Sequence, residues 1–562
     1  MMRPPALSKV TIRTLRHNLQ TKRFAVPKLQ RNFVWDPGRA AKLLDSIFQD
    51  MPIGSLFLWE MDRKSAGLIR QSTAEILPQF NSSNKTIWFV IDGQQRLSVI
   101  YQAFEGERKE NDVGRKIDFG RLCFVVEPDQ DVESPPRVVY RKPVDRQFAP
   151  VKDILAPDWR RRFAPASKKY LAKLKDFRDQ VLRYPVPIVT VQGATLEQIG
   201  EIFIRVNSQG MRITSADRAV ALMGKLDVRA MAQELRQKVR ESGFQMGGID
   251  SILMGFNLVT ERPNLDGDPP KLDAMARRWE KKLEGNEREK AHFGKLWHQY
   301  QRAFQTAVDY LRHRFPVYDE TFLPSANMLA VLSVFFFNHR GQPNRHQADE
   351  ICKWFWATGV AQRYTGRGYH RNLMMDTKLF ASLARGAKSR FVFRDYLDPV
   401  LDIQTAEYGS RSTRARAFFC LLALQRPRYL EGGESIPLES EVLSHANRKH
   451  RHHIFPQAQL RARVSSRAYN SLCNICFLVS RDNTMIGSQL PRRYLAQFRD
   501  QGREGFRRTM KSHLIPVGDD SGVWDRGVVT AYKKFRRNRL RLLCAAFERA
   551  AGMRLFKRIQ AG

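Results

Sequence analysis

Two adjacent histidines at the start of a short apolar run restrict what the C-terminal part of this chain can form. Residues 450–459 read His-Arg-His-His-Ile-Phe-Pro-Gln-Ala-Gln. Side chains alternate between the two faces of a strand, so His452 and His453 can serve one site only where a strand ends or twists. Pro456 cannot continue a central strand, which favours a strand end directly after the pair. The sequence therefore predicts a short strand that presents histidine at its end.

Histidine at such a position suits hydrolytic chemistry. Hydrolysis of a phosphodiester needs an activated water, a Lewis acid on the phosphate and a means of stabilising the leaving oxygen. The pKa of imidazole lies close to neutral pH, so a neutral imidazole can accept a proton from water. His453 is therefore our candidate general base.

The run His453-Ile454-Phe455-Pro456-Gln457, followed by Asn474 and Asn483, resembles the core of the HNH, or ββα-metal, nucleases. The resemblance implies a first strand with the histidines, a loop, a second strand and a helix. It also implies that Asn474 braces the loop and orients His453, and that His452 and Asn483 hold a divalent metal (Mg²⁺ or Mn²⁺). His452 stands where many members of that group carry Asp. Imidazole suits Mn²⁺, Ni²⁺ or Zn²⁺ better than Mg²⁺, so the preferred metal stays open.

Composition limits the class of protein. A chain of 562 residues is too long for one compact core, and two to four domains are expected. The longest apolar runs, such as Met328 to Phe337, are shorter than the roughly 20 residues that span a bilayer, so no membrane span is predicted. The N-terminus has no apolar signal core, and a cytoplasmic protein is expected. We predict that Cys473 and Cys476, a Cys-x-x-Cys pair, are buried thiols beside Asn474.

The net charge points to a polyanionic partner. The sequence has 95 Lys and Arg against 57 Asp and Glu, a formal charge of +38. Phosphate backbones are the commonest intracellular polyanions, so nucleic acid is the leading partner. An arginine-rich proteome is the alternative explanation. Residues 530–559 read as a basic amphipathic helix pair broken near Gly552, whose solvent side carries cations expected to face DNA. These cations are Lys533, Lys534, Arg536 and Arg537, with Arg539 and Arg541 also expected in solvent.

The pattern along the chain predicts an α+β multidomain protein. Strand-like runs cover residues 55–59, 86–91, 123–126 and 187–191, and helical spacing covers 40–48, 96–104 and 196–204. A loop is expected at 264–270 and helices at 272–283, 293–314 and 348–356. We therefore expect an N-terminal domain over 1–235, a helical connector over 236–409 and a C-terminal nuclease domain over 410–562.

A strand-to-helix turn in the first part of the chain is a second candidate site. The run Asp92-Gly93-Gln94-Gln95-Arg96 follows a buried strand and precedes a helix. Asp92 is expected to cap the helix, and Gly93 permits the tight turn. Free amides at a helix N-terminus, with Gln94, Gln95 and Arg96 beside them, make an anion site.

Two more stretches, 26–35 and 202–210, join this turn in a resemblance to the GmrS-like domain, whose fold is similar to ParB and sulfiredoxin. The resemblance implies that Asp92, Gly93, Gln94, Gln95 and Arg96 contact nucleotide or DNA phosphate. It makes Gln30, Arg31, Arg205 and Asn207 auxiliary residues of that site. The sequence has no Gly-x-x-x-x-Gly-Lys-Ser/Thr loop, which excludes a P-loop mechanism.

A GmrS-like domain followed by a GmrD-like HNH domain resembles the GmrSD family of modification-dependent restriction endonucleases, which includes SspE-type phosphorothioate-sensing phage-defence effectors. The resemblance implies an antiphage DNA endonuclease or nickase. Its N-terminal domain would hydrolyse a nucleoside triphosphate (GTP or ATP) and help to sense phosphorothioate or modified cytosine in double-stranded DNA. Two alternatives stay open: a nucleotide-switched, ParB-like DNA-binding regulator with a degenerate HNH core, and an RNA-directed nuclease. Homo-oligomerisation is also open.

Overall fold

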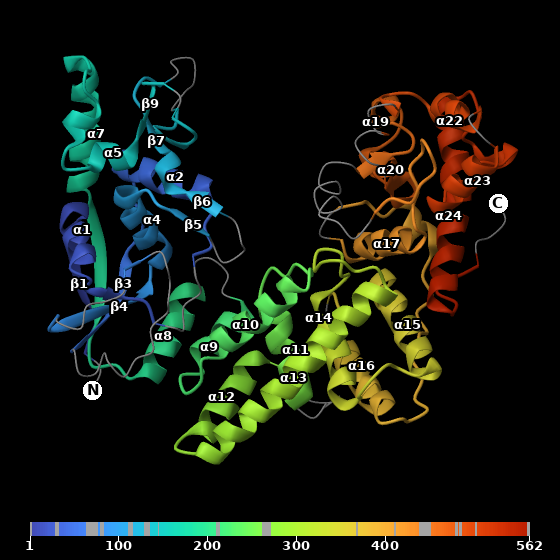
Figure 1. Ribbon diagram of the computed structural model, residues 1–562, viewed down its shortest axis with the longest axis horizontal. Helices are drawn as coiled ribbons and strands as arrows, with labels where there is room; N and C mark the ends of the chain where they lie inside the picture. Colours follow the sequence, from blue (N-terminus) through green and yellow to red (C-terminus); the bar gives the residue numbers. More distant parts are fainter. Residues whose placement is uncertain are drawn as a thin grey trace. The chain divides into compact units, whose positions relative to one another are not determined.

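The chain forms two compact units (Figure 1), one of Met1–Met231 with Leu272–Glu287 and one of Ala232–Lys271 with Arg288–Gly562. The computed structural model describes residues 3–27, 33–62, 77–78, 84–110, 116–128, 135–143, 145–208, 214–260, 271–366, 369–409, 412–437, 451–477, 482, 486–500 and 503–558. The expected loop at 264–270 lies outside these residues. Compact units differ from functional domains, so the boundaries after residues 235 and 409 stay predictions.

The first unit is built on a mixed five-stranded sheet in the order β1-β10-β3-β4-β2. β10 pairs parallel with β3 and antiparallel with β1, while β4 pairs antiparallel with β3 and parallel with β2. The strands are β1 (Ala6–Thr11), β2 (Phe24–Ala25), β3 (Leu56–Asp62), β4 (Thr86–Asp92) and β10 (Pro185–Val191).

Both faces of this sheet are buried. Along β4, Ile87, Phe89 and Ile91 pack on one face, in a cluster that includes Phe203 of α8 (Leu196–Ser208). Val90 points to the other face and joins the larger core. This period of two is the one expected for a strand between two layers of helices.

Helices pack against this sheet, against one another and against the smaller sheets of the unit. They are α1 (Ile12–Gln20), α2 (Pro37–Phe48), α4 (Gln94–Glu105), α5 (Val151–Leu155), α6 (Trp159–Arg162), α7 (Lys168–Arg183), α8, α9 (Ser215–Ala221) and α12 (Leu272–Leu283). Two small sheets complete it, β5 (Arg108–Glu110) with β6 (Lys116–Asp118), and β7 (Leu122–Val125) between β8 (Val138–Tyr140) and β9 (Phe148–Pro150). The 3₁₀ turn η1 (Phe119–Arg121) leads into β7.

The second unit begins as a helical array. Its helices α11 (Asp250–Thr260), α13 (Glu287–Arg314), α14 (Ala326–Asn338), α15 (Arg345–Val360), α16 (Tyr369–Ala384) and α17 (Thr413–Leu424) follow α10 (Val228–Glu241), within which the chain leaves the first unit. A π-helical turn, η2 (Val400–Gln404), lies between α16 and α17. α14 is apolar around most of its circumference because neighbouring helices cover it.

The C-terminal part of this unit surrounds a two-stranded antiparallel ribbon, β11 (Arg451–His453) and β12 (Ile475–Phe477). Short helices connect the strands, namely α19 (Gln457–Leu460), α20 (Ser466–Tyr469) and the 3₁₀ turn η3 (Leu472–Asn474). The chain continues through α22 (Pro491–Asp500), α23 (Arg503–Ser512), the 3₁₀ turn η4 (Asp519–Ser521) and the long helix α24 (Val528–Ala551). In Figure 1 these elements form the orange and red part of the ribbon.

The expected α+β multidomain class is confirmed in its general form. The four strand-like runs correspond to β3, β4, β7 and β10, and the predicted helices to α2, α4, α8, α12, α13 and α15. In the part of the chain that is described, no helix is both long and apolar enough to cross a membrane.

Three local predictions are wrong. The helix α4 is capped by Gly93, which has a φ of 92°, and the Asp92 side chain instead pairs with Arg96. The C-terminal segment is one helix, α24, that ends at Gly552, and not a helix pair. Arg539, expected in solvent, is 0% exposed, because α24 packs this part of its surface against the ribbon.

Arg539 holds the ribbon to α24. Its guanidinium donates to the backbone oxygens of Cys473 (3.3 Å), Ile475 (2.7 Å) and His513 (3.1 Å). Burial lowers the pKa of Arg539, although arginine keeps its charge at neutral pH. Since buried carbonyls without a donor are costly, the guanidinium stabilises the chain on both sides of Asn474.

We predict that Arg539→Met lowers the free energy of unfolding of the second unit by about 3 kcal/mol, because three buried carbonyls lose their donor. Urea unfolding measures the loss, and hydrogen exchange of peptides covering 451–477 locates it. The control is Arg541→Met, an exposed arginine of the same helix. Equal stability of the two variants would contradict the role of Arg539.

Candidate functional site

The two histidines lie on the edge of the β11–β12 ribbon and face different surroundings. His452 is opposite Cys476 and His453 is opposite Ile475. His452 is buried, at 6% exposure, whereas His453 is half-buried. Neighbouring positions on a strand point to opposite faces, so the ribbon presents one imidazole to the interior and the other toward the surface.

Asn474 joins the end of β11 to the turn before β12. Its Oδ1 accepts from the Phe455 amide (2.8 Å), and its Nδ2 donates to the carbonyls of Phe455 (3.1 Å) and Tyr469 (2.9 Å). The backbone adds a bond from Ile454 N to Asn474 O (2.8 Å). Asn474 is fully buried, and its four contacts fix the path of the chain directly after His453.

The ring of His453 is held by a different asparagine. Its Nε2 lies 3.1 Å from Asn470 Oδ1. The rings of Tyr408 and Tyr469 approach it at steep angles, with centroid distances of 5.5 Å and 6.5 Å. Tyr408 comes from the segment after η2, whose Ala406 carbonyl accepts from Leu472 N (2.9 Å).

Burial lowers the pKa of His453, and the bond with Asn470 opposes part of that shift. A lowered pKa means that the imidazole is neutral over a wider range toward acid. Its capacity to accept a proton is therefore present above that pKa and is lost as the pH falls through it.

The two cysteines that flank Asn474 are buried, as predicted. Cys473 is 0% and Cys476 is 2% exposed. Burial raises the pKa of Cys473 to about 11 and that of Cys476 to about 12. Both groups are thus neutral thiols that pack the ribbon.

The described residues do not by themselves make a metal site. Within them, no group of three His, Cys, Asp or Glu side chains is placed to hold a metal ion. Of the expected ligand pair, His452 is described and buried, while Asn483 lies outside the described residues. The described residues therefore include one of the two expected ligands, and the metal expectation stays a prediction.

The cations expected to face DNA divide into two kinds. Lys533 and Arg537 are exposed on α24. Lys534 instead pairs with Asp520 (2.7 Å) and Asp525 (3.5 Å), and Arg536 donates to the Gln404 carbonyl (2.8 Å). The side chains of Lys534 and Arg536 therefore bond to groups within the protein.

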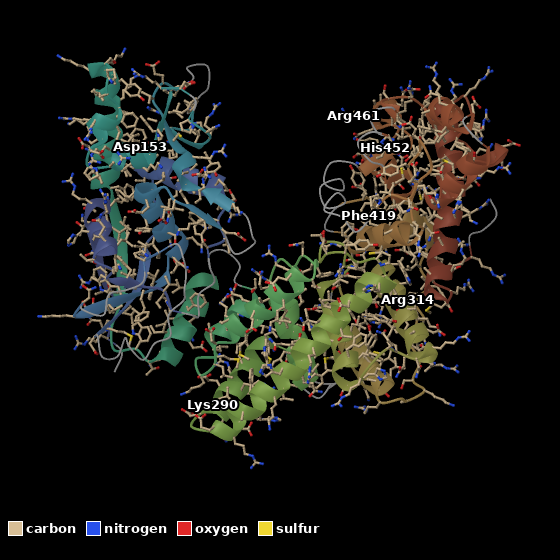
Figure 2. The ribbon with its side chains drawn as sticks, viewed as in Figure 1. Asp153, Lys290, Arg314, Phe419, His452 and Arg461 are labelled. Carbon is tan, nitrogen blue, oxygen red and sulfur yellow. The ribbon has the colours of Figure 1, made fainter. Side chains whose placement is uncertain are left out.

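Sequence reasoning missed three arginines that are nearer to His453 in the sequence than α24 is. Arg461, Arg463 and Arg467 are exposed on the connection between β11 and β12, and Figure 2 marks Arg461 and His452 in the same C-terminal region. The run 451–477 contains four arginines and no acidic residue. This local excess of arginine could have identified the three residues from the sequence. The run of cations in α24 is denser and was chosen instead.

The second candidate site lies where β4 ends. The β3–β4 ladder changes register between Phe57 and Leu58, so Phe57 pairs with Asp92. Such bulges re-aim side chains next to functional sites. Asp92 Oδ2 accepts from Arg96 Nη2 at 2.7 Å, and Arg96 Nη1 donates to the Ile53 carbonyl at 2.9 Å.

Glycines allow this close packing. Gly93 (φ 92°) and Gly54 (φ 81°) both have left-handed backbone, which favours glycine. A Cβ on Gly93 would lie 2.5 Å from Leu56 Cδ2, and one on Gly54 would lie 2.2 Å from Arg96 Nη1. The turn thus has its tight geometry because both positions lack a side chain.

Gln94 and Gln95 have different environments. Gln94 is buried, at 4% exposure, while Gln95 Oε1 accepts from the amides of Val34 (2.9 Å) and Trp35 (3.3 Å). Gln95 thereby ties the chain that follows residues 28–32 to the start of α4. Gln30 and Arg31 fall within 28–32, outside the described residues.

The remaining predicted residues lie on α8, which packs across β4. Arg205 is exposed near the C-terminal end of this helix, and Asn207 follows two residues later. The structure therefore places Asp92 and the Gln94–Arg96 run together, and it leaves their relation to Gln30, Arg31 and the Asn207 side chain as a prediction.

Comparisons with known proteins bear on the whole chain and on its N-terminal part. An uncharacterized protein of Methanocaldococcus jannaschii, MJ0686, is 21% identical over 525 residues, which cover 84% of each chain. Residues 12–223 match the family model of the GmrSD restriction endonuclease, N-terminal domain. The matched region contains the bulged β3–β4 ladder, the Asp92–Arg96 turn and α8. The similarity to the GmrSD family thus covers this N-terminal domain.

Proposed function

We propose that this chain is a defence nuclease that hydrolyses phosphodiester bonds in double-stranded DNA. The match to the GmrSD N-terminal domain supports a restriction endonuclease. The observation that carries the catalytic assignment is the half-buried imidazole of His453, hydrogen-bonded at Nε2 to Asn470 Oδ1. A strand end with a positioned imidazole, followed in the sequence by exposed arginines, suits attack on a phosphodiester.

In this proposal His453 takes a proton from the attacking water. The pKa of His453 is lowered by burial, so the ring is ready to accept that proton at neutral pH. Asn474 holds the chain after His453 through its bonds to Phe455 and Tyr469. We propose an Mg²⁺ or Mn²⁺ ion with His452 and Asn483 as ligands, which would supply Lewis acidity at the phosphate.

The N-terminal unit is proposed to bind and hydrolyse GTP or ATP at the Asp92–Arg96 turn and to help sense phosphorothioate or modified cytosine. The amides at the start of α4 point toward the end of β4, where a helix N-terminus attracts phosphate. The guanidinium of Arg96 bonds to the Asp92 carboxylate and to the Ile53 carbonyl, and these two bonds fix its position. Nucleotide turnover there would control cleavage by the C-terminal site.

The second candidate function is a nucleotide-switched DNA-binding regulator with a degenerate nuclease core. The burial of His452, at the position where an acidic ligand is expected by resemblance, favours it. Plasmid nicking with Mg²⁺ or Mn²⁺ separates the two, because a regulator binds DNA without relaxing supercoiled plasmid. Parallel assays on RNA test the RNA-directed alternative.

We predict that His453→Ala lowers the rate of plasmid nicking by about 100-fold or more, since a general base contributes on the order of 10² to 10⁴ in rate. NTP hydrolysis by the same variant should match that of the wild type, because the proposed nucleotide site belongs to the other unit of the chain. Gel assays of supercoiled plasmid and phosphate release measure the two activities. Nicking at the wild-type rate would remove His453 from the role of base.

We predict that Asp92→Asn lowers kcat/KM for NTP hydrolysis about tenfold, or about 1.4 kcal/mol, because Arg96 loses its charged partner. Phosphate release on unmodified and phosphorothioate DNA measures the effect. Asp179→Asn, which removes an exposed ion pair with Lys175 on α7, is the matched control. An equal rate for the two variants would argue against a nucleotide site at this turn.

We predict that replacing Arg461, Arg463 and Arg467 together by Gln weakens DNA binding and lowers the slope of log K against log salt by about 3, because each phosphate contact contributes roughly 0.9. Fluorescence anisotropy at several salt concentrations measures the slope. The control replaces Arg340, Arg371 and Lys378, exposed cations of the same unit, by Gln. A slope equal to that of the control would place the DNA elsewhere.

A further inference from the structure

The hydrogen bonds around Asn470 form a chain that ends at the imidazole of His453. Asn470 Oδ1 lies 3.1 Å from His453 Nε2, and its Nδ2 donates to Ser466 Oγ at 3.2 Å. The pKa of the Tyr469 phenol is lowered, first by its hydrogen bond with Ser466 and then by that with Gln457. A Ser466 hydroxyl that donates to the phenol leaves its oxygen to accept from Asn470.

The direction of this chain determines the state of the imidazole. An amide oxygen can only accept a hydrogen bond, so the Nε2 that faces Asn470 Oδ1 must carry the proton. In neutral imidazole the other nitrogen, Nδ1, then has the lone pair. We propose that Asn470 is a positioning residue that holds His453 in the Nε2–H form and in one ring orientation, so that Nδ1 is the atom that accepts the proton from water.

The surroundings of the ring support a fixed orientation. Tyr408 meets it edge to face at an interplanar angle of 83°, and Tyr469 at 63°. The backbone of Asn470 is itself held, because its carbonyl accepts from Tyr408 N at 3.3 Å and its amide donates to Ser466 O at 3.0 Å. A catalytic group with one ring orientation needs such support, since small losses of orientation lower rates strongly.

This inference rests on the proposed nuclease function, and it assigns to Asn470 a role that differs from that of Asn474. Asn474 bonds to the backbone on both sides of the turn and shapes the chain. Asn470 bonds to the ring itself. Loss of Asn470 should therefore affect the chemical step more than DNA binding or folding.

Three variants of the full chain test the kinetic part. Asn470→Leu, which has a similar shape without an acceptor, should lower kcat for plasmid nicking about 10- to 100-fold while KM for DNA changes less than about threefold. Asn470→Asp restores an acceptor and should recover most of that loss. Asn538→Leu is the control, because the side chain of Asn538 on α24 donates to the exposed backbone carbonyl of Asp520 in η4. Equal kcat for Asn470→Leu and Asn538→Leu would overturn the proposal.

A spectroscopic measurement tests the same proposal without relying on nicking. In the full chain labelled with ¹⁵N-histidine, the signals of His453 are assigned by their loss in His453→Ala. Nε2 should have the shift of a protonated nitrogen and Nδ1 that of an unprotonated one, with the Nε2 proton exchanging faster in Asn470→Leu. Protonation at Nδ1 would overturn the proposal. If the wild type does not nick DNA, the proposed function fails, and the ¹⁵N shifts still decide the state of the ring.

Discussion

The guanidinium of Arg539 donates hydrogen bonds to the carbonyls of Cys473, Ile475 and His513, and the geometry of the candidate nuclease site depends on these bonds. Two of the three carbonyls belong to the neighbours of Asn474. That asparagine in turn fixes the chain after His453 through Phe455. The helix α24 therefore supports the site through the buried guanidinium of Arg539, which is 0% exposed.

The N-terminal unit uses the same principle at the Asp92–Arg96 turn. Arg96 and Gln95 donate to or accept from backbone groups that are 43 and 61 residues away in sequence. Polar side chains that satisfy buried backbone groups in this way give a loop one conformation, because each alternative leaves a donor or acceptor unpaired. Both candidate sites are thus built from loops that side chains hold in place.

The sequence was a good guide to elements with a clear period. β4 and the helices α12 and α13 lie where alternation and helical spacing predicted them, since burial on two sides or along one face leaves a visible pattern. It was a poor guide to single polar residues. Asp is a residue type that often caps helices, so Asp92 was expected to cap α4. Gly93, with its left-handed backbone, occupies the cap position, and the Asp92 side chain pairs with Arg96.

The sequence by itself determined the α+β character of the chain, its basic charge and the residue types at the two candidate sites. These properties depend on local spacing and on composition. Only the tertiary structure decided that Arg539 is buried, that Lys534 and Arg536 bond within the protein, and that Asn470 faces His453. Such contacts join residues 9 to 132 positions apart, and a local pattern carries no information about which of many similar side chains will meet.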